Sequence, residues 1–374
     1  MLRFLTSGES HGKCLVAILE GMVAGLEIKE ADINRELSRS QEGYGRGGRM
    51  TIEKDHVEIL SGVRFDRTIG GPIALWVPNK DFKINQLPVV KRSRPDHADL
   101  VGALKYERED ARDILERASA RETTSRVAVG AVCRSFLKEF GVEVISHVVS
   151  IGGVKADTAD LDFEQIKKEA LHSPMHCADK KAEKKMMACV DEAQKSKDTI
   201  GGIFEVRAKG LPVGLGSFVH YDRRLSAKLC AALMSIQAVK GVEVGIGFEV
   251  SELLGRQVHD EIHHDKKKGF YRKTNRAGGL EGGVTNGEEL VLRAATKPYA
   301  TLMNPLQSVN IDSKAKESAT VERSDVTAVP ACGVVGEAMA AFELANSFLE
   351  KFGGDSLKET KRNYEGYLKQ VEAR

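Results

Sequence analysis

Residues 8–13 read GESHGK, and this short stretch is compatible with three kinds of chemistry. Gly8 to Gly12 match the G-x-S-x-G turn that exposes the nucleophilic serine of many hydrolases. Gly8 to Lys13 also match part of a phosphate-binding loop. The third interpretation is a histidine, His11, held out between glycines as a proton donor. The elements around the stretch decide between these interpretations.

The sequence context disfavours the first two. A hydrolase serine needs an oxyanion donor from an earlier loop of its sheet, and Ser10 has only one candidate strand before it. A phosphate-binding loop has four residues between its glycines and then Lys-Ser or Lys-Thr. Here three residues intervene, and Cys14 occupies the place of the metal-binding hydroxyl. The proton-donor interpretation of His11 is the one that stays.

Residues 43–48, GYGRGG, match the G-x-G-x-x-G dinucleotide fingerprint letter for letter. That fingerprint requires a strand before it and a helix after it, whereas this stretch follows an expected helix and leads into an expected hairpin. We interpret it as a loop whose backbone approaches a ligand while Arg46 and Arg49 supply positive charge. An ordinary surface turn with solvated arginines is equally compatible with these residues.

Two further stretches carry residues suited to acid–base or anion chemistry. His97 lies in RPDHAD beside two carboxylates, which can adjust a histidine for proton transfer, although a surface histidine at a helix start is the alternative. Arg117, Ser119, Arg121 and Arg126 gather in ERASARETTSR, which we expect at the front of a long helix. Such a place favours an anion, and the alternative is a capped helix with a charged outer face.

The C-terminal half adds loops that suit a planar ligand. LEGGVTNG (280–287) and KPYAT (297–301) frame one expected strand with backbone-rich loops, which could contact a planar cofactor through main-chain groups. Arg323 and Asp325 lie just before an apolar helix, where they could also form a simple surface ion pair.

Two histidine clusters are candidate metal sites. His172 and His176 lie beside Cys177, and the other cluster is His259, His263 and His264. Neither has an obvious further ligand or the H-E-x-x-H order of zinc enzymes. We therefore expect no metal and interpret both clusters as solvent-exposed loops.

The composition restricts the class of protein. With 374 residues, 41% hydrophobic and 29% charged, the chain is typical of a soluble globular protein, and no stretch suggests a membrane span or a signal peptide. The six cysteines are irregularly spaced without a C-x-x-C pair, which indicates a reduced, cytoplasmic chain. The net charge is only +2, yet arginines concentrate in a few loops, which predicts a multiply anionic small-molecule ligand. Nucleic acid is disfavoured because those loops lack interleaved aromatic residues.

The elements that must position these residues mix helices and strands without strict alternation, so we expect an α+β fold. Helices are expected at 31–40, which starts with an aspartate cap, at 122–140, at 224–236, and over a last stretch that places Val334, Ala338, Phe342, Ala345 and Leu349 on one stripe. Strands are expected at 1–6, 72–77, 142–151, 199–211, 242–250 and 288–296, with a hairpin at 51–63. We expect one domain, 1–374, with a peripheral helical excursion at 155–197.

Taken together, the motifs resemble a known family. GESHG, GYGRGGRM, RPxHAD, RASARET, SIxAVKGVEVGxGF, GGxxGGxxNG, KPxxT and ERSD…AVP occur in this order from residue 8 into the last long helix. Each motif alone is unspecific, but the combination covers nearly the whole chain and resembles the chorismate synthases. The resemblance implies a β-α-β sandwich with helices packed between antiparallel sheets, and a homotetramer.

The resemblance also implies an activity. Members of the family eliminate phosphate from 5-enolpyruvylshikimate 3-phosphate by anti-1,4-elimination to give chorismate, in the last common step of aromatic amino acid biosynthesis. They require reduced FMN, which is not consumed. Since no flavin reductase extension is seen, we expect NADPH to act only indirectly, through a separate flavin-reducing system. The alternative enzyme class is a flavin-dependent oxidoreductase, which would consume flavin electrons stoichiometrically.

The matching motifs imply roles for individual residues. His11 would protonate the departing phosphate, which Ser10 would orient, with Ser119 as a further catalytic residue. His97 would donate a proton to N1 of the reduced flavin, while Asp325 would assist transfer of the ring hydrogen to N5. The residues implied to bind the substrate's anionic groups are Arg46, Arg49, Arg121 and Arg323. The residues implied to contact FMN are Arg117, Ala118, Ser119, Gln237, Ala238, Gly282, Lys297, Pro298, Tyr299, Ala300, Thr301 and Arg323.

Four positions depart from the family pattern. Asp96 replaces the usual glycine, and we expect its carboxylate to stabilise the charged form of His97. Ser40 stands where many members carry an arginine, so Arg39 is a candidate substitute. Tyr299 and Ala300 replace Thr-Pro, which leaves backbone contacts with the cofactor plausible.

Overall fold

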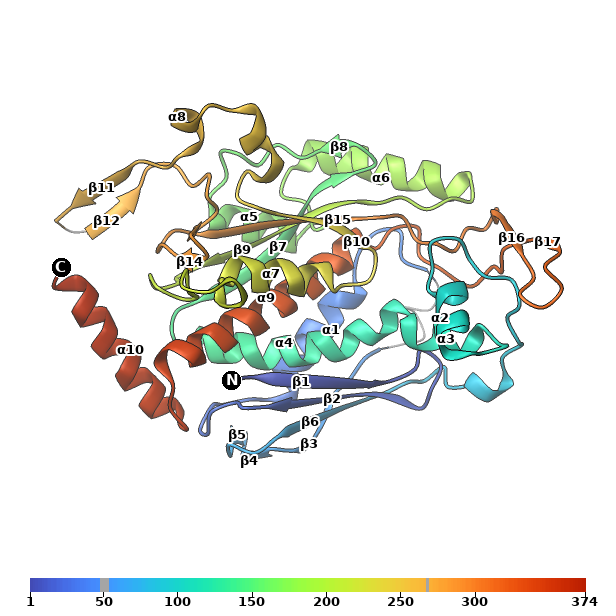
Figure 1. Ribbon diagram of the computed structural model, residues 1–374, viewed down its shortest axis with the longest axis horizontal. Coiled ribbons are helices and arrows are strands. Elements are labelled where there is room, and N and C mark those ends of the chain that lie inside the picture. Colours follow the sequence, from blue (N-terminus) through green and yellow to red (C-terminus); the bar gives the residue numbers. More distant parts are fainter. Residues whose placement is uncertain (48–53, 267–268) are drawn as a thin grey trace.

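Two antiparallel sheets enclose a layer of helices in this computed structural model, which describes residues 1–47, 54–266 and 269–374 (Figure 1). The first sheet has the strand order β1-β2-β6-β3, with the bounds β1 Arg3–Gly8, β2 Cys14–Glu20, β3 Glu58–Ser61 and β6 Ile73–Pro78. The second has the order β10-β15-β9-β7-β8, with the bounds β7 Glu143–Ile151, β8 Val154–Lys155, β9 Gly202–Lys209, β10 Val239–Val244 and β15 Leu290–Thr296. The predicted α+β sandwich is confirmed.

The helices divide into a layer between the sheets and a set around them. Between the sheets lie α1 Glu30–Gln41, α4 Thr123–Lys138 and α9 Val329–Phe352, with α7 Leu225–Met234 beside α9 (Figure 1). The others are α2 Asp99–Tyr106, α3 Arg112–Ala118, α5 Phe163–Leu171, α6 Lys180–Lys195, α8 Gly255–Val258 and α10 Leu357–Glu372. No helix in the described ranges combines the length and apolar character that crossing a bilayer requires.

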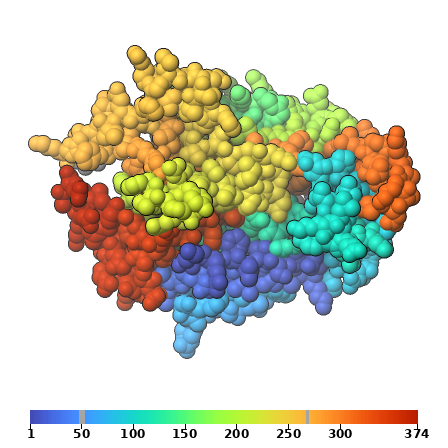
Figure 2. All heavy atoms as spheres, viewed as in Figure 1, coloured from blue at the N-terminus to red at the C-terminus, as the bar shows by residue number. Residues whose placement is uncertain are grey.

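Short hairpins extend from this framework. Their strands are β4 Val63–Arg64 with β5 Arg67–Thr68, β11 Ile262–Asp265 with β12 Gly269–Arg272, β13 Leu280–Glu281 with β14 Val284–Thr285, and β16 Gln307–Val309 with β17 Lys316–Ser318. The β11–β12 hairpin projects from the body of the molecule, as Figure 2 shows at its upper left.

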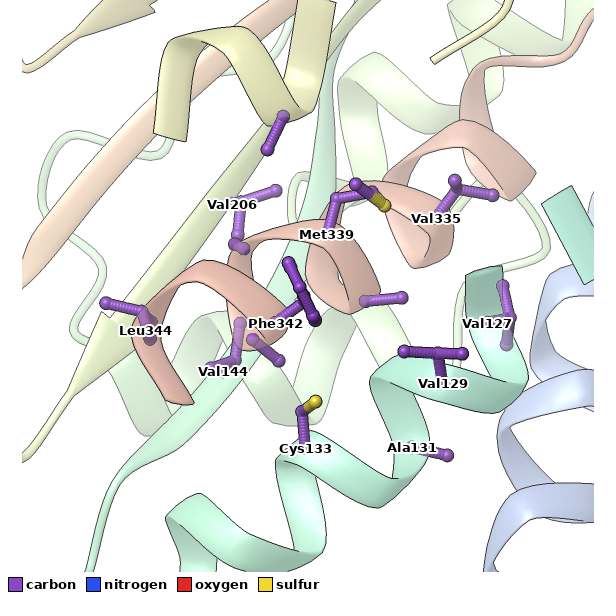
Figure 3. Close-up of a cluster of buried hydrophobic side chains, with 14 of the residues drawn as sticks. Val127, Val129, Ala131, Cys133, Val144, Val206, Val335, Met339, Phe342 and Leu344 are labelled. Atoms are coloured by element: carbon purple, nitrogen blue, oxygen red, sulfur yellow. The ribbon is translucent and has the colours of Figure 1, made fainter. Parts of the chain in front are cut away.

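Helix α9 is buried on nearly every side. The predicted stripe is confirmed, but its opposite face is buried as well, because α9 packs on α4, α7 and strands β7 and β9 at once (Figure 3). A helix that is apolar all round belongs in the interior. Side chains from both sheets join it in one hydrophobic cluster, including Leu19, Leu75, Phe204 and Leu292. The single-domain assignment for 1–374 stays a prediction.

Several predicted boundaries were wrong. Helix α1 begins at Glu30, so Asp32 lies in its first turn and is not its cap; there it complements the helix dipole. The described part of 51–63 forms no hairpin, because β3 pairs with β6. The strand expected over 242–250 ends at Val244, since Gly245 and Gly247 adopt positive φ of 61° and 57° and a 3₁₀ turn follows. Helices α5 and α6 occupy the 155–197 segment, whereas α10 was missed.

A buried ion network ties the helix layer together. Glu337 of α9 accepts hydrogen bonds from Arg39 of α1 at 2.8 Å, from Ser146 of β7 at 2.7 Å, and from Arg134 of α4. Burial alone raises the pKa of Glu337, but the charges of Arg39 and Arg134 and the hydrogen bonds outweigh it and lower the pKa to about 2. The carboxylate therefore stays charged inside the protein.

We expect Glu337 to contribute a part of the free energy of unfolding that is lost in acid. A carboxylate whose pKa is lowered on folding stabilises fully above its ordinary pKa of 4.5, and that stabilisation is lost as the pH falls towards 2. Glu337→Gln should reduce this dependence of the free energy of unfolding on pH. It should also lower stability at neutral pH by about 3 kcal/mol, since Arg39 and Arg134 lose their fully buried carboxylate partner and keep Glu36. Urea unfolding at a series of pH values measures both effects. A variant with the wild-type slope between pH 4.5 and 2 would contradict the assignment.

The contact between α4 and α9 requires glycine at residue 130. A Cβ built there would lie 2.3 Å from the Cβ and 2.4 Å from the Cα of Ala338. Gly130→Ala should therefore lower the free energy of unfolding by about 1–3 kcal/mol, because the helices must move apart. Gly366→Ala in α10 is the matched control, because nothing lies within 4 Å of its added Cβ. That change should stabilise by about 0.5–1 kcal/mol, so two thermal unfolding shifts of the same sign would refute the packing argument.

Candidate active site

A cavity of about 390 Å³ opens where the ends of several elements meet. It lies between the β1–β2 turn, the C-terminal end of α1, the loop before α2, the α3–α4 junction and the first turns of α9. The structure brings together at this cavity the following residues predicted from the sequence: Ser10, His11, Arg46, His97, Ser119, Arg121, Gln237, Tyr299, Ala300, Thr301, Arg323 and Asp325.

Other predicted site residues do not line this cavity. They are Arg117, Ala118, Ala238, Gly282, Lys297 and Pro298. Arg117 instead donates hydrogen bonds to the carbonyls of Gly8 and Thr6, so it supports the β1–β2 turn. Arg49 lies outside the described residues. Arg117, Ser119 and Arg121 also precede the long helix instead of opening it, because α4 begins at Thr123.

GESHGK forms the turn between two antiparallel strands, which excludes both the hydrolase elbow and the phosphate-binding loop. Gly8 has φ +107°, and a Cβ there would lie 2.3 Å from the carbonyl oxygen of Cys14, so the turn requires glycine. The buried amide of Asn79 donates to the carbonyls of Glu9, Ser10 and Gly12 and holds the turn in shape. His11 is thus presented on a rigid loop.

The imidazole of His11 is held from one side by Glu116. Its Nδ1 lies 3.0 Å from both carboxylate oxygens of Glu116, which also accepts the His11 backbone N–H at 2.8 Å. Burial alone raises the pKa of Glu116, but the hydrogen bonds from His11 outweigh it, so the pKa is lowered and Glu116 stays charged. On the other side, Nε2 of His11 lies 3.9 Å from Asp81. Ser119 Oγ donates to Ser10 Oγ at 3.3 Å, which places two hydroxyls beside this ring.

His97 is held in a similar way. Its Nδ1 lies 2.5 Å from Asp99, which is fully buried and also accepts hydrogen bonds from Arg94 at 2.8 and 3.0 Å. Arg94 donates to Thr301 at 2.8 Å and so ties this loop to the KPYAT loop. Burial alone raises the pKa of Asp99, but the hydrogen bonds from His97 and Arg94 hold the pKa well below its usual range.

The prediction that the Asp96 carboxylate stabilises the charged form of His97 was wrong, because the Asp96 side chain contacts other residues. The Asp96 carboxylate instead accepts a hydrogen bond from Lys297 at 2.6 Å and lies 3.6 Å from the amino group of Lys240. The second carboxylate of RPDHAD, Asp99, is the one that contacts the ring. Asp96 has φ +57°, a left-handed conformation that favours glycine, which explains why glycine is usual in the resembling motif.

Asp325 and Arg46 form the opposite wall. Arg46 contacts Asp325 at 2.7 Å, the Gly47 amide donates to Asp325 at 2.5 Å, and the Tyr299 hydroxyl is hydrogen-bonded to it as well. Burial raises the pKa of Tyr299, so its hydroxyl stays protonated and can donate. The described part of GYGRGG is a loop packed on the segment before α9, not a dinucleotide fingerprint.

Within the described residues, the arginines implied to bind substrate, Arg46, Arg121 and Arg323, already have carboxylate partners. Arg121 makes two hydrogen bonds to buried Asp55, at 2.6 and 2.7 Å, and Arg323 contacts Asp81 at 2.6 Å. Arg39 was wrong as a substitute for Ser40: it is bound to Glu337, and Ser40 itself lines the cavity. The cavity thus combines fixed cations with carboxylates close by.

The residues that sequence reasoning missed are mainly these partners: Glu116, Asp55, Asn79, Asp81 and Arg94. Arg94 is the first residue of the RPxHAD motif, and its position three residues before His97 could have indicated that it supports that histidine. Asp55 and Glu116 had no such signal, since their partners are distant in the sequence.

The two histidine clusters that are candidate metal sites do not line the cavity. The prediction that His176 is exposed was wrong: it is half-buried near Arg39, and burial followed by that charge lowers its pKa. His263 and His264 lie on β11, not on a loop. Within 1–47, 54–266 and 269–374, no three His, Cys, Asp or Glu side chains cluster as metal ligands would.

Known proteins of one family match this chain over almost its whole length. The sequence model of the chorismate synthase family matches residues 2–349. The chain is 54% identical to chorismate synthase of Geobacter sulfurreducens over 100% of both chains, and 52% identical to that of Desulforamulus reducens over 99% of this chain and 100% of the relative. A crystal structure of chorismate synthase superposes with a TM-score of 0.84 at 43% identity, covering 100% of this chain and 99% of that one. The chain therefore belongs to the chorismate synthase family.

Proposed function

We propose that this chain eliminates phosphate from 5-enolpyruvylshikimate 3-phosphate to give chorismate. The allylic C–O bond breaks, phosphate leaves with the electron pair, a ring hydrogen is lost, and the ring gains a double bond without net redox change. The family supports the chemistry, and one observation carries it for this chain. His11 and His97, each set by a buried carboxylate, line the same arginine-rich cavity. This combination suits a trianionic substrate that must be protonated as it breaks.

His11 is the acid for the leaving group in this proposal. A phosphate leaves more readily when its oxygen is protonated, and the His11 imidazole, held by Glu116 at Nδ1, lines the cavity where it could donate that proton. The Ser10 and Ser119 hydroxyls would orient the phosphate beside it. Arg46, Arg121 and Arg323 would bind the anionic groups, exchanging part of their contacts with Asp325, Asp55 and Asp81 for contacts with substrate.

The cavity fits reduced FMN. The side-chain amide nitrogen of Gln237 donates to Glu122 at 3.1 Å. Its buried Oε1 accepts no hydrogen bond from the described residues, so it could accept one from an N–H of a planar ring. Ala328, Ala331 and Val335 of the α9 end give an apolar surface for such a ring. When bound, the reduced flavin would lend electron density to the substrate and accept the ring hydrogen. A volume near 390 Å³ is within the range of small-molecule sites.

The chain's own groups would serve that cofactor in defined ways. Gln237, Ser119, Arg323 and the segment 299–301 would hold it. His97 would hold a proton on the ring nitrogen that faces away from Asp99, and Asp325, fixed by Arg46 and Gly47, would assist removal of the ring hydrogen. The further contacts implied for FMN, at Arg117, Ala118, Ala238, Gly282, Lys297 and Pro298, stay predictions. Reduced flavin would come from a separate system that uses NADPH, in a reducing cytoplasm that suits six free cysteines.

Anaerobic phosphate release with photoreduced FMN tests the two histidines. His11→Ala and His97→Ala should each slow turnover by about 10²–10⁴-fold, the usual contribution of a general acid, while FMN still binds. His172→Ala is the control, because the His172 side chain is exposed, contacts the Lys168 carbonyl through Nδ1 and does not line the cavity. Near wild-type turnover in either variant removes that histidine from the mechanism. Flavin oxidised in proportion to product would favour the oxidoreductase alternative.

We also propose a homotetramer. Leu5 and Ile18 are paired across β1 and β2 on the outer side of the first sheet, where they are 74% and 43% exposed. Exposed apolar side chains at this place suit a surface that another subunit would cover. Light scattering should give about four times the 40.9 kDa chain mass. The Leu5→Glu, Ile18→Glu double variant should give a smaller assembly, whereas Leu171→Glu on α5 should not. A monomeric wild type would refute the tetramer, and an unchanged double variant would refute this surface.

A further inference from the structure

Each of the two cavity histidines ends a buried chain of three side chains. In one chain, Arg112 contacts Glu116 at 3.4 Å, and Glu116 lies 3.0 Å from Nδ1 of His11. In the other, Arg94 contacts Asp99 at 2.8 Å, and Asp99 lies 2.5 Å from Nδ1 of His97. The two chains come from different elements, yet they present the same order of groups and use the same ring nitrogen.

Burial makes these carboxylates strong orienting groups. Glu116 is 1% exposed and Asp99 is 0% exposed, so neither can turn to water for hydrogen bonds. Their arginine partners are 5% and 8% exposed, which balances the buried negative charge and keeps the carboxylates ionised. An ionised carboxylate only accepts hydrogen bonds. The Nδ1 of His11 must therefore carry a hydrogen. At His97 the Nη2 of Arg94 also lies 3.1 Å from Nδ1, but the carboxylate of Asp99 is closer, at 2.5 Å, and Nη2 has Asp99 itself as an acceptor at 3.0 Å, so Nδ1 carries a hydrogen there as well.

A fixed Nδ1–H determines what the other ring nitrogen can do. In the neutral ring Nε2 has a lone pair, and in the charged ring it carries the proton that can be given away. Without the carboxylate, the neutral ring could place its hydrogen on either nitrogen, and its plane could rotate. A residue that sets the tautomer acts on the rate without touching substrate.

We infer that Glu116 and Asp99 are positioning residues that fix the Nδ1–H tautomer of His11 and His97, so that Nε2 is the proton-exchanging atom at both. This inference rests on the proposed function for its effect on turnover, but the tautomers themselves do not depend on it. Arg112 and Arg94 support the arrangement by keeping each carboxylate charged and in place. Arg112 is itself fixed by Glu322 at 2.8 Å, and Arg94 by Thr301.

A third chain of the same composition provides a matched control. His147 is fully buried, and its Nε2 lies 3.0 Å from Glu205, which accepts from Arg293 at 2.7 Å. These residues form a row across β7, β9 and β15, and none of them lines the cavity. Glu205→Gln thus makes the same chemical change beside a buried histidine without reaching the reaction.

The experiment compares Glu116→Gln, Asp99→Asn and Glu205→Gln by ¹⁵N NMR of the imidazoles in the ligand-free protein, and by anaerobic turnover. In wild type, His11 and His97 should show the Nδ1–H form. Because an amide can donate as well as accept, the first two variants should lose that signature and reduce kcat by about 10²–10⁴-fold, with KM changed less than tenfold. Glu205→Gln should alter only the signal of His147 and keep kcat within threefold of wild type.

Charge-conserving variants keep the test decisive if the amide variants do not fold. Glu116→Asp and Asp99→Glu keep the negative charge and should retain the Nδ1–H signature with a smaller loss of kcat than the amides. Unchanged tautomers in the folded amide variants overturn the inference, as does an equal loss of kcat in Glu205→Gln. If wild type releases no phosphate while the tautomers shift as expected, the proposed reaction fails and the positioning role stands.

Discussion

Helix α9 is enclosed by the second sheet on one side and by α4, α1 and α7 on the others, and this enclosure constrains the rest of the molecule. The helix can be so surrounded only because small residues allow close approach, as where Gly130 meets Ala338. Its first two turns supply Ala331 and Val335 to the cavity, beside Ala328, which precedes the helix. The same rigid element therefore forms the centre of the core and one wall of the site, so a change in packing moves both.

The enclosure of α9 also explains why buried carboxylates are paired with arginines. Glu337 is placed in the interior by α9 and is balanced there by arginines from α1 and α4. At the cavity the same arrangement recurs with Arg46 and Asp325 and with Arg121 and Asp55. Paired charges hold their side chains in fixed positions before any ligand arrives. An incoming anion would meet guanidinium groups that are already oriented, at the cost of competing with their carboxylates.

The sequence motifs identified one partner of the main contacts at the cavity but not the other. His11, His97, Arg46 and Asp325 stood out because glycines, a proline or neighbouring charges flank them, and all four lie at one cavity. Asp99 was visible as a neighbour of His97, but the sequence could not distinguish it from Asp96. The backbone made that choice: the left-handed Asp96 turns its side chain towards Lys297, while Asp99 at the start of α2 points at the ring.

Local patterns by themselves determined most strand and helix types, the glycine-dependent turn at Gly8 and the family, because periodicity, turn chemistry and motif order are properties of short stretches. Only the tertiary structure decided that Glu116 lies against His11, that Asp55 neutralises Arg121, and that β3 pairs with β6. These contacts join segments that are far apart in the chain, and which of several acidic residues becomes the partner depends on how sheets and helices pack. Burial then gives the chosen pair its strength, and burial is a property of the whole fold.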